Sequence, residues 1–282
     1  MKKILITGAN SYIGTSFENY IKEHYSSEYI VDTVDMIDDS WREKDFSEYD
    51  SVFHVAGIAH QKETKENASL YYKVNRDLAV ETAEKAKRDG VKQFVFLSSM
   101  SVYGMDVGVI TKETKPDPKS NYGKSKLQAE DGINFLVDDS FKVCIIRPPM
   151  VYGKNCKGNF QTVCKLVRKS PVFPKVKNER SLIYIVNLCS FVRMCIDQKL
   201  EGLYFPQNKE YVNTSVMAKV IADKIGRKIV FSRFVGFCVC MIRPFVGMAK
   251  KAFGTLVYQD TEDFNFGYCV VDSENSFRLS VE

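Results

Sequence analysis

Apolar and polar residues alternate along the first two-thirds of the chain in blocks typical of strands and helices. Nearly continuous apolar runs, such as Phe94 to Leu97, predict strands that are buried on both faces. Amphipathic stretches between these runs predict helices. The expected strands are residues 3–7, 29–34, 51–55, 93–98 and 142–147, and the expected helices are residues 13–24, 67–89 and 121–137. Such an alternation is typical of βαβ units, so we predict an α/β fold with a parallel sheet.

After Gly153 the pattern loosens into connections rich in Lys, Pro and Asn, which predict a smaller α/β substrate domain. One strongly apolar segment in this part, residues 229–247, is interrupted by Arg233, Arg243 and Pro244. Its uncharged stretch is shorter than the ~20 residues that a membrane span needs. We expect the segment to be buried in the folded domain. The alternative, which stays open for 229–247, is an interfacial segment that lies on a membrane with its arginines at the headgroups.

Composition narrows the class of protein. The 282 residues suffice for one large or two modest domains, and 45% hydrophobic with 27% charged residues is ordinary for a soluble globular protein. The net charge of +5 is mild, so we expect no nucleic-acid partner. Basic residues cluster loosely from 165 to 177, either as a solvated face or as a surface that attracts a diphosphate.

Cysteine usage and the start of the chain suggest a compartment. The eight cysteines include no Cys-x-x-Cys pair and accompany only three histidines, so we expect no metal site. Because the first expected strand begins at residue 3, we expect no signal peptide. Reduced thiols in a cytoplasmic protein fit this pattern best.

A glycine-rich turn, Gly8-x-x-Ser11-x-x-Gly14, follows the first expected strand and opens the first expected helix. In that context such a turn places the N–H groups of a helix N-terminus against the pyrophosphate of a dinucleotide. Gly8 would allow the tight turn and Gly14 the close helix–strand packing. Ser11 stands where the middle glycine is usual, so we expect a slightly shifted phosphate or a hydroxyl bond to it.

Tyr122 and Lys126 lie four residues apart in an expected helix, downstream of the pair Ser98-Ser99. This spacing puts the phenol and the ammonium on one face of the helix. There the ammonium can stabilise a phenolate and lower the pKa of the tyrosine towards neutrality. Taken singly these motifs are weak evidence, because Tyr and Lys at helical spacing often only pack or face water.

Taken together and in this order, the motifs resemble the extended short-chain dehydrogenase/reductase family, the nucleotide-sugar epimerases and their relatives. The resemblance runs from Met1 to about Leu188. Further segments in family order are Asp50-Ser-Val-Phe-His-Val-Ala-Gly57, Asn75 in Tyr-Lys-Val-Asn-Arg, Ser98-Ser-Met-Ser-Val-Tyr-Gly104 and Arg147-Pro-Pro-Met-Val-Tyr-Gly153. The resemblance implies a Rossmann-type, doubly wound parallel sheet with a smaller α/β C-terminal substrate-binding domain.

It also implies a division of labour along the chain. Residues 1–154 would form an NAD-binding, Rossmann-like domain, and residues 155–282 mainly a substrate-binding cap. The chain would return to the first domain near 181–206, where Leu203 to Pro206 predict a short strand.

NAD is the expected cofactor. Asp35, at the end of the second expected strand, can accept hydrogen bonds from both adenosine-ribose hydroxyls and would repel a 2′-phosphate. Asp32 competes for that role, and Arg42 leaves NADP open. By resemblance, the cofactor-binding residues are Gly8, Asn10, Ser11, Tyr12, Ile13, Gly14, Asp35, Asp45, Ala56, Gly57, Asn75, Ser98, Tyr122, Lys126 and Pro148.

The resemblance assigns catalysis to Ser99, Tyr122 and Lys126. Tyr122 would be the acid/base, Lys126 its electrostatic partner, and Ser99 the hydroxyl that binds the reacting oxygen. Family dehydratases carry an Asp-Glu pair where this chain has Met100 and Ser101. Elimination of water is therefore not expected, and hydride chemistry on a sugar hydroxyl or ketone remains.

The expected substrate contacts are Ser99, Tyr122, Asn159 and Arg180. Met150 stands where many relatives have an asparagine that contacts the diphosphate, and Asn159 can compensate for it. The C-terminal part also lacks the Arg-x-Gly-Asp stretch of many relatives, whereas Arg180 matches a family arginine that reaches the diphosphate.

The predicted function is an NAD-dependent 4-epimerase of a nucleotide-linked hexose or N-acetylhexosamine, in the first place a UDP-sugar, for surface polysaccharide precursors. The alternative is a 4-ketoreductase of a nucleotide-linked deoxysugar that uses NADH or NADPH. An epimerase of a polyprenyl-diphosphate sugar and a non-catalytic dinucleotide sensor are less favoured. A homodimer stays open.

Overall fold

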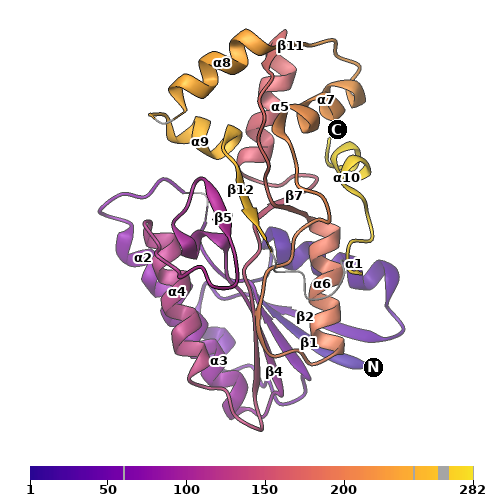
Figure 1. Cartoon of the computed structure of the whole chain (residues 1–282). Helices are drawn as coiled ribbons and strands as arrows, with labels where there is room; N and C mark the ends of the chain where they lie inside the picture. Colours follow the sequence, from indigo (N-terminus) through magenta and orange to yellow (C-terminus); the bar gives the residue numbers. More distant parts are fainter. Residues whose placement is uncertain (60, 244, 260–266, 282) are drawn as a thin grey trace. The chain divides into compact units, whose positions relative to one another are not determined.

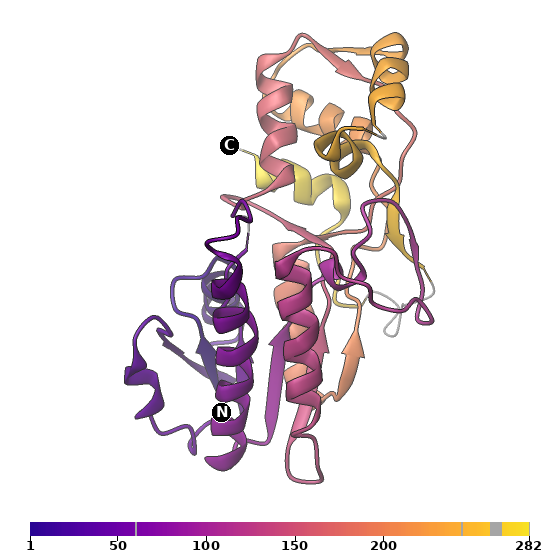
Figure 2. The ribbon, with the colours of Figure 1, turned by 90° about the vertical axis from the view of Figure 1, so that its left-hand side faces the viewer.

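The computed structural model describes residues 1–59, 61–243, 245–259 and 267–281. The chain forms two compact units (Figure 1), and the ribbon is seen from a second side in Figure 2. Unit 1 comprises residues 1–104, 115–148 and 189–206, and unit 2 comprises residues 105–114, 149–188 and 207–282. The assignment of NAD binding to one part and substrate binding to the other stays a prediction.

Unit 1 is built on a six-stranded sheet in the order β10-β6-β4-β3-β1-β2, and its five strand pairings are all parallel. The strands are β1 Lys2–Thr7, β2 Tyr29–Val34, β3 Ser51–His54, β4 Gln93–Leu97, β6 Lys142–Ile146 and β10 Gly202–Tyr204. The strands predicted from apolar runs are confirmed, and the short strand expected near residues 203–206 is β10.

Helices cover both faces of this sheet, with α1 and α6 on one side and α2, α3 and α4 on the other (Figure 1). Their bounds are α1 Tyr12–His24, α2 Ala68–Tyr72, α3 Leu78–Arg88, α4 Asn121–Asn134 and α6 Ile185–Asp197. Short elements are the 3₁₀ turns η1 Asp39–Arg42 and η3 Met100–Tyr103 and the π-helical turn η2 Lys73–Asp77. The single helix predicted over 67–89 is thus interrupted by η2. The sequence did not predict this interruption, because no local pattern of residues indicates a π turn.

Apolar side chains join the helices to the sheet. On the side of α3, alanines at positions 79, 83 and 86 lie at helical spacing in one buried cluster with Phe94 and Phe96 of β4. On the side of α1, the rings of Phe17 and Phe53 meet edge to face with centroids 5.2 Å apart. The strand order reverses between β1 and β3, and open parallel sheets bind ligands at the carboxyl ends of strands beside such a reversal.

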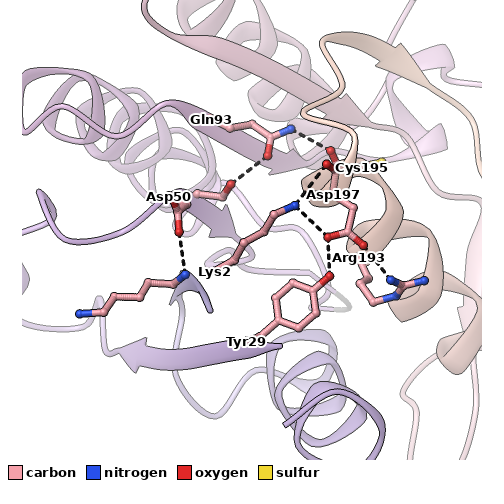
Figure 3. A network of polar contacts seen from close by, with 9 residues as sticks. Lys2, Tyr29, Asp50, Gln93, Arg193, Cys195 and Asp197 are labelled. Atoms are coloured by element: carbon pink, nitrogen blue, oxygen red, sulfur yellow. Dashed lines mark hydrogen bonds and ion pairs between the residues drawn. The ribbon is translucent and has the colours of Figure 1, made fainter. Parts of the chain in front are cut away.

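Partly buried polar contacts hold the opposite, amino-terminal edge of the sheet to the end of α6 (Figure 3). The Asp197 carboxylate accepts bonds from Lys2 Nζ at 3.0 Å, from Arg193 at 2.7 Å and from the Tyr29 hydroxyl. Burial, followed by the contact with Asp197, raises the pKa of Tyr29 to about 12. This network fastens the returning segment 189–206 to the first strands of the chain.

Unit 2 contains three two-stranded parallel pairs, namely β7 with β9, β8 with β11 and β5 with β12. Its strands are β5 Gly108–Ile110, β7 Met150–Tyr152, β8 Val172–Pro174, β9 Leu182–Tyr184, β11 Val230–Ser232 and β12 Leu256–Tyr258, and its helices are α5 Asn159–Lys169, α7 Thr214–Lys224, α8 Arg233–Ile242, α9 Gly247–Phe253 and α10 Ser273–Ser280. Tyr152 lies at its centre: the ring packs against Phe160 and Phe277, and the hydroxyl contacts Ser276 and Asn208.

The prediction that the apolar segment 229–247 is buried is wrong. The segment forms β11 and α8, and the side chains of Phe234, Phe237 and Phe245 are 75%, 64% and 88% exposed. A hydrophobic sequence indicates that a helix avoids water but does not supply a neighbour to cover it. None of the helices in the described residues is long and apolar enough to cross a bilayer.

Gln93 provides a test of the buried polar edge. Its amide donates to the carbonyls of Cys195 and Leu200, each at 3.0 Å, and accepts from Ser51 Oγ at 2.9 Å. Gln93→Met fills the same volume but leaves these buried groups unpaired, so it should lower the free energy of unfolding by about 1–3 kcal/mol in urea titrations. The exposed Gln128→Met is the control and should change it by less than about 0.5 kcal/mol. Equal effects would contradict this account.

Candidate active site

The glycine-rich turn lies at the carboxyl end of β1. Gly8 has φ +112°, and a Cβ there would lie 2.7 Å from the backbone nitrogen of Ala56, which follows β3. Only glycine therefore fits between the ends of these two strands. The N–H groups of Gly8 and Ala9 donate to the Val34 carbonyl at 2.9 and 3.0 Å, which fixes the turn beside the end of β2.

The turn leads directly into α1. Asn10 has φ +63°, and Ser11 is the N-cap, whose hydroxyl oxygen accepts the Gly14 N–H at 3.1 Å. This bond uses the oxygen as an acceptor, so its hydrogen can still be donated to a phosphate. Tyr12 and Ile13 are the first two helical residues, and the N–H groups of a first turn have no partner within the helix. The cradle without a Cβ at Gly8 and this helix start fit a dinucleotide pyrophosphate.

The carboxylates around β2 differ in what they contact. Asp35 is exposed just beyond the end of the strand, whereas Asp32 lies within it and accepts the Tyr49 hydroxyl at 2.8 Å. Arg42 is already paired with Glu81, with Nη2 to Oε2 at 2.7 Å. The Asp35 carboxylate accepts the Ile37 N–H at 2.9 Å, and its expected role as the ribose ligand stays a prediction.

Asp45 is exposed in the segment between η1 and β3. Its carboxylate accepts the Ser47 N–H at 2.8 Å, and this backbone bond is the main reason why the pKa of Asp45 is lowered. The side chain is therefore ionised and held in place, as an adenine contact would require, although its role stays a prediction.

Asn75 lies in the π turn and fastens the segment after β3. It is fully buried; its Oδ1 accepts the Ile58 N–H at 2.8 Å, and its Nδ2 donates to the Ile58 carbonyl and to Ser125 Oγ. A Cβ on Gly57 would lie 2.9 Å from that Oδ1 and 3.5 Å from the amine of Lys126. Gly57, Asn75 and Lys126 thus lie close together, and their expected role in binding the cofactor stays a prediction.

Lys126 places a nearly buried amine at this point. Its Nζ donates to the Leu97 carbonyl at 2.8 Å and lies 4.7 Å from the centroid of the Phe96 ring. Burial lowers the pKa of Lys126 to about 8, although the Glu130 carboxylate raises it in part. The amine is mainly charged at neutral pH and can donate to a ribose or substrate hydroxyl.

Tyr122 sits in the first turn of α4, which three contacts hold in place. The Glu63 carboxylate accepts the N–H groups of Asn121 and Tyr122 at 2.9 and 3.0 Å, and Ser120 caps the Gly123 N–H at 3.0 Å. A Cβ on Gly123 would lie 2.5 Å from the Ser101 carbonyl oxygen. Glycine after Tyr122 therefore lets the helix approach the turn that carries Ser99.

The Ser99 hydroxyl is the N-cap of η3 and accepts the Ser101 N–H at 3.1 Å. It also interacts with the Tyr122 phenol and lowers the pKa of that group. Burial has a larger and opposite effect, so the pKa of Tyr122 is raised overall. The prediction that the pKa of Tyr122 is lowered towards neutrality is therefore wrong for the chain alone, because desolvation outweighs the contact with Ser99.

A buried network beneath Ser99 was not apparent from the sequence. The Ser98 hydroxyl donates to Glu130 of α4, the Arg147 guanidinium binds the same carboxylate, and Arg147 Nη1 donates to the Tyr103 hydroxyl at 2.8 Å. Ser98 thus uses its side chain to position the site, so any contact that it makes with a cofactor would come from its backbone. Another expected cofactor residue, Pro148, is buried, and its carbonyl accepts the Met100 N–H at 2.9 Å.

Unit 2 contains the two remaining expected substrate residues, Asn159 and Arg180. Both line one small hollow of about 10 Å³, together with Met150. The guanidinium of Arg180 donates to the Gly254 carbonyl at 3.0 Å, whereas its buried Nε has no acceptor among the described residues. The hollow itself is too small for a diphosphate, but Asn159 lies beside Met150, where it could supply the missing amide.

Comparison with known proteins gives one family and several close relatives. A model described as the NAD dependent epimerase/dehydratase family matches residues 4–204. The UDP-glucose 4-epimerase of Vibrio cholerae is 32% identical over 253 residues, which cover 80% of this chain and 76% of that protein. The N-acetyl-alpha-D-glucosaminyl-diphospho-ditrans,octacis-undecaprenol 4-epimerase of Escherichia coli O157:H7 is 25% identical over 245 residues, or 80% and 73% of the two chains.

Solved structures share the fold at lower identity. The UDP-glucuronic acid 4-epimerase from Bacillus cereus in complex with NAD has a TM-score of 0.75 at 18% identity, over 99% of this chain and 97% of that one. A dTDP-4-dehydrorhamnose reductase from Clostridium acetobutylicum has a TM-score of 0.74 at 21% identity, over 99% and 98%. Epimerases and reductases therefore share this fold, and the fold alone does not separate the two reactions.

The buried amine of Lys126 should titrate far below an ordinary lysine. Because burial disfavours its charged form, an NMR pH titration should place the inflection of the Lys126 side chain near pH 8, and not near 10.5. The signal can be assigned by its loss in Lys126→Arg, with the exposed lysines as internal reference. Since the unfolded chain binds this proton more tightly, the group should add stability as the pH rises from about 8 to about 10.5. An inflection above pH ~10 would contradict the buried position.

Proposed function

Because the chain belongs to the NAD dependent epimerase/dehydratase family, we propose that this NAD-dependent enzyme is a 4-epimerase of a nucleotide-linked hexose or N-acetylhexosamine. The observation that carries the proposal is the contact of Ser99 with Tyr122 at the carboxyl edge of the sheet, with Lys126 one turn further along α4 and with Met100 and Ser101 in place of acids. The similarity to two relatives named as 4-epimerases supports it.

The residues of the chain suit a reversible oxidation of one sugar carbon. NAD, when bound, can take a hydride from that carbon and return it. Tyr122 would take the proton of the 4-hydroxyl as the ketone forms and give it back when the alcohol is restored. Ser99 would donate to the reacting oxygen, and Lys126 would add positive charge. Returning hydride to the other face of the ketone inverts C4, so there is no net redox change.

The resting protonation of Tyr122 has a consequence for this scheme. Burial raises its pKa, so in the chain alone the phenol is protonated at neutral pH. It is therefore ready to donate a proton to a ketone, whereas proton removal requires added positive charge in the site. Lys126 carries most of its charge below pH 8 and can contribute to it.

For the nucleotide we favour UDP, and Arg180 supports a diphosphate-linked substrate. Its buried Nε lacks an acceptor among the described residues, and a buried donor without a partner is costly unless a ligand supplies one. Asn159, beside Met150, could add an amide donor. We also propose a cytoplasmic location and a role in surface polysaccharide precursors. Free thiols in contact, such as Cys144 and Cys195, suit a reducing compartment.

The deciding experiment is incubation of the purified protein with NAD and a panel of UDP-hexoses and UDP-N-acetylhexosamines. An epimerase should give products of unchanged mass with inverted C4 in NMR spectra. In D₂O no deuterium should appear at C4, because that hydrogen leaves and returns as hydride. Consumption of NADH or NADPH with a 4-keto sugar, and no epimerisation, would instead identify a ketoreductase. NAD binding without any turnover would leave only a sensor.

Tyr122→Phe should remove the proton-transferring hydroxyl while leaving the ring and its packing. We expect kcat to fall by about 10²–10⁴-fold and the Kd for NAD to change little. The matched control is Tyr25→Phe. Tyr25 is a partly buried tyrosine at the carboxyl end of α1, and this variant should keep full activity. If Tyr122→Phe kept more than about a tenth of the wild-type rate, the acid/base would have to be another group.

Asp35→Ala should weaken NAD and relax the discrimination against NADP. The variant loses both the ribose contacts and the repulsion of a 2′-phosphate, so the ratio of the two dissociation constants should shift by about 10-fold or more. Asp32→Ala is the matched control, because Asp32 is bound by Tyr49 within β2. If the ratio changed only in the control, Asp32 would be the ribose ligand.

A further inference from the structure

Helix α8 presents apolar side chains on two faces and is covered on only one. Its inner face is narrow: a Cβ on Gly236 would lie 2.2 Å from the Lys175 carbonyl oxygen, so the helix backbone lies directly on that segment. On the outer face Phe234, Phe237 and Met241 follow each other at helical spacing and are 75%, 64% and 61% exposed. A helix that is apolar all round is normally buried, so its exposure needs an explanation.

The apolar surface extends beyond the helix at both ends. Val230 lies before it in β11, and Ile242, Phe245 and Val246 follow the outer row, all exposed. Figure 1 shows α8 between β11, which precedes it, and α9, which follows it. Scattered exposed apolar residues are ordinary, whereas a continuous group of this kind marks an interaction surface.

Positive charge surrounds the same segment. Between Asp223 and Asp260 the sequence has seven basic residues, Lys224, Arg227, Lys228, Arg233, Arg243, Lys250 and Lys251, and no acidic one. Since the whole chain carries +5, the remaining residues have a net charge of −2. Residues 224–259 therefore carry +7, which is more than the net charge of the whole chain.

Two of these cations lie beside a hollow at the end of the apolar surface. Arg243 and Lys250 line an open space of about 370 Å³ together with Val107, Gly108 and Thr255. Arg243 follows the exposed Ile242 directly, and its Nη1 donates to the Phe253 carbonyl at 3.2 Å. Two cations around a space of this size suit an anionic phosphate group next to apolar chains.

We propose that α8 and its basic surroundings dock unit 2 onto the surface of an anionic lipid bilayer. Phe234, Phe237 and Met241 enter the boundary between headgroups and acyl chains, while the surrounding cations contact lipid phosphates. With ten residues α8 is too short to span the ~30 Å hydrocarbon core, so it lies in the interface plane. The proposal uses none of the catalytic residues and stands independently of the proposed epimerase activity.

Charge decides between a membrane and a second copy of this chain as the occupant. A two-fold dimer through this surface would place the same patch of each protomer against the other. Residues 224–259, with seven basic residues and no acidic one, would then be brought against the same segment of the second copy, and juxtaposed like charges are costly. An anionic bilayer satisfies both the apolar row and the cations.

The test is flotation of the full chain with vesicles of phosphatidylcholine alone or mixed with phosphatidylglycerol. The protein should float with the anionic vesicles, less so at high salt, and weakly with the neutral ones. Phe234→Ser/Phe237→Ser/Met241→Ser should lower the apparent affinity by at least about 10-fold. Arg233→Gln/Lys251→Gln should lower it by about 5-fold for each charge removed.

The matched control is Phe135→Ser/Leu279→Ser, which removes side chains that are 89% and 59% exposed on other elements. It should bind vesicles as the wild type does. All the substituted residues are exposed, so thermal melts should show folded variants. No flotation with anionic vesicles, or equal flotation of the triple variant, would overturn the proposal. Sedimentation showing a dimer that the triple variant loses, without vesicle binding, would assign the surface to self-association instead.

Discussion

The site of unit 1 depends on close backbone approaches for which a Cβ leaves no room. Gly8 lies against Ala56, so the ends of β1 and β3 can meet at the strand reversal, and Gly123 lies against the Ser101 carbonyl, so α4 can approach η3. A Cβ at either position would lie less than 3 Å from a backbone atom, so the two segments would have to move apart. The glycine-rich turn after β1 and the contact of Ser99 with Tyr122 therefore depend on the same constraint.

Hydrogen bonds to two carboxylates then hold α4 in the position that these close approaches allow. Glu63 holds the start of α4 through two backbone N–H groups, while Glu130, further along the helix, holds Arg147 beneath Ser98. Carboxylates thus anchor both ends of the helical face that carries Lys126. Lys126 itself is buried, and its amine is held at the Leu97 carbonyl.

The parts of the fold that depend on local periodicity could be predicted from the sequence. Five strands and the helices α1 and α4 lie within three residues of the predicted bounds, because apolar runs and amphipathic stretches specify them locally. The turn at Gly8 and Gly14 could also be predicted, since the spacing of these glycines after a strand indicates a tight turn. The contacts of Glu63 and of Glu130 with Arg147 were not, because they join residues that only the tertiary fold brings together. The raised pKa of Tyr122 could not be predicted for a related reason, because desolvation depends on all the groups that pack around the phenol.

The exposure of α8 shows what an apolar pattern can and cannot decide. The sequence of this segment specifies a helix that avoids water, and a buried helix and an interfacial helix satisfy that condition equally. Flanking charge distinguishes them, because a core helix gains nothing from seven cations without a counter-charge. The whole-chain net charge of +5 hides the fact that residues 224–259 alone carry +7. Net charge therefore describes a protein poorly when its basic residues gather beside its most exposed apolar ones, and their local distribution is the quantity that selects a membrane surface.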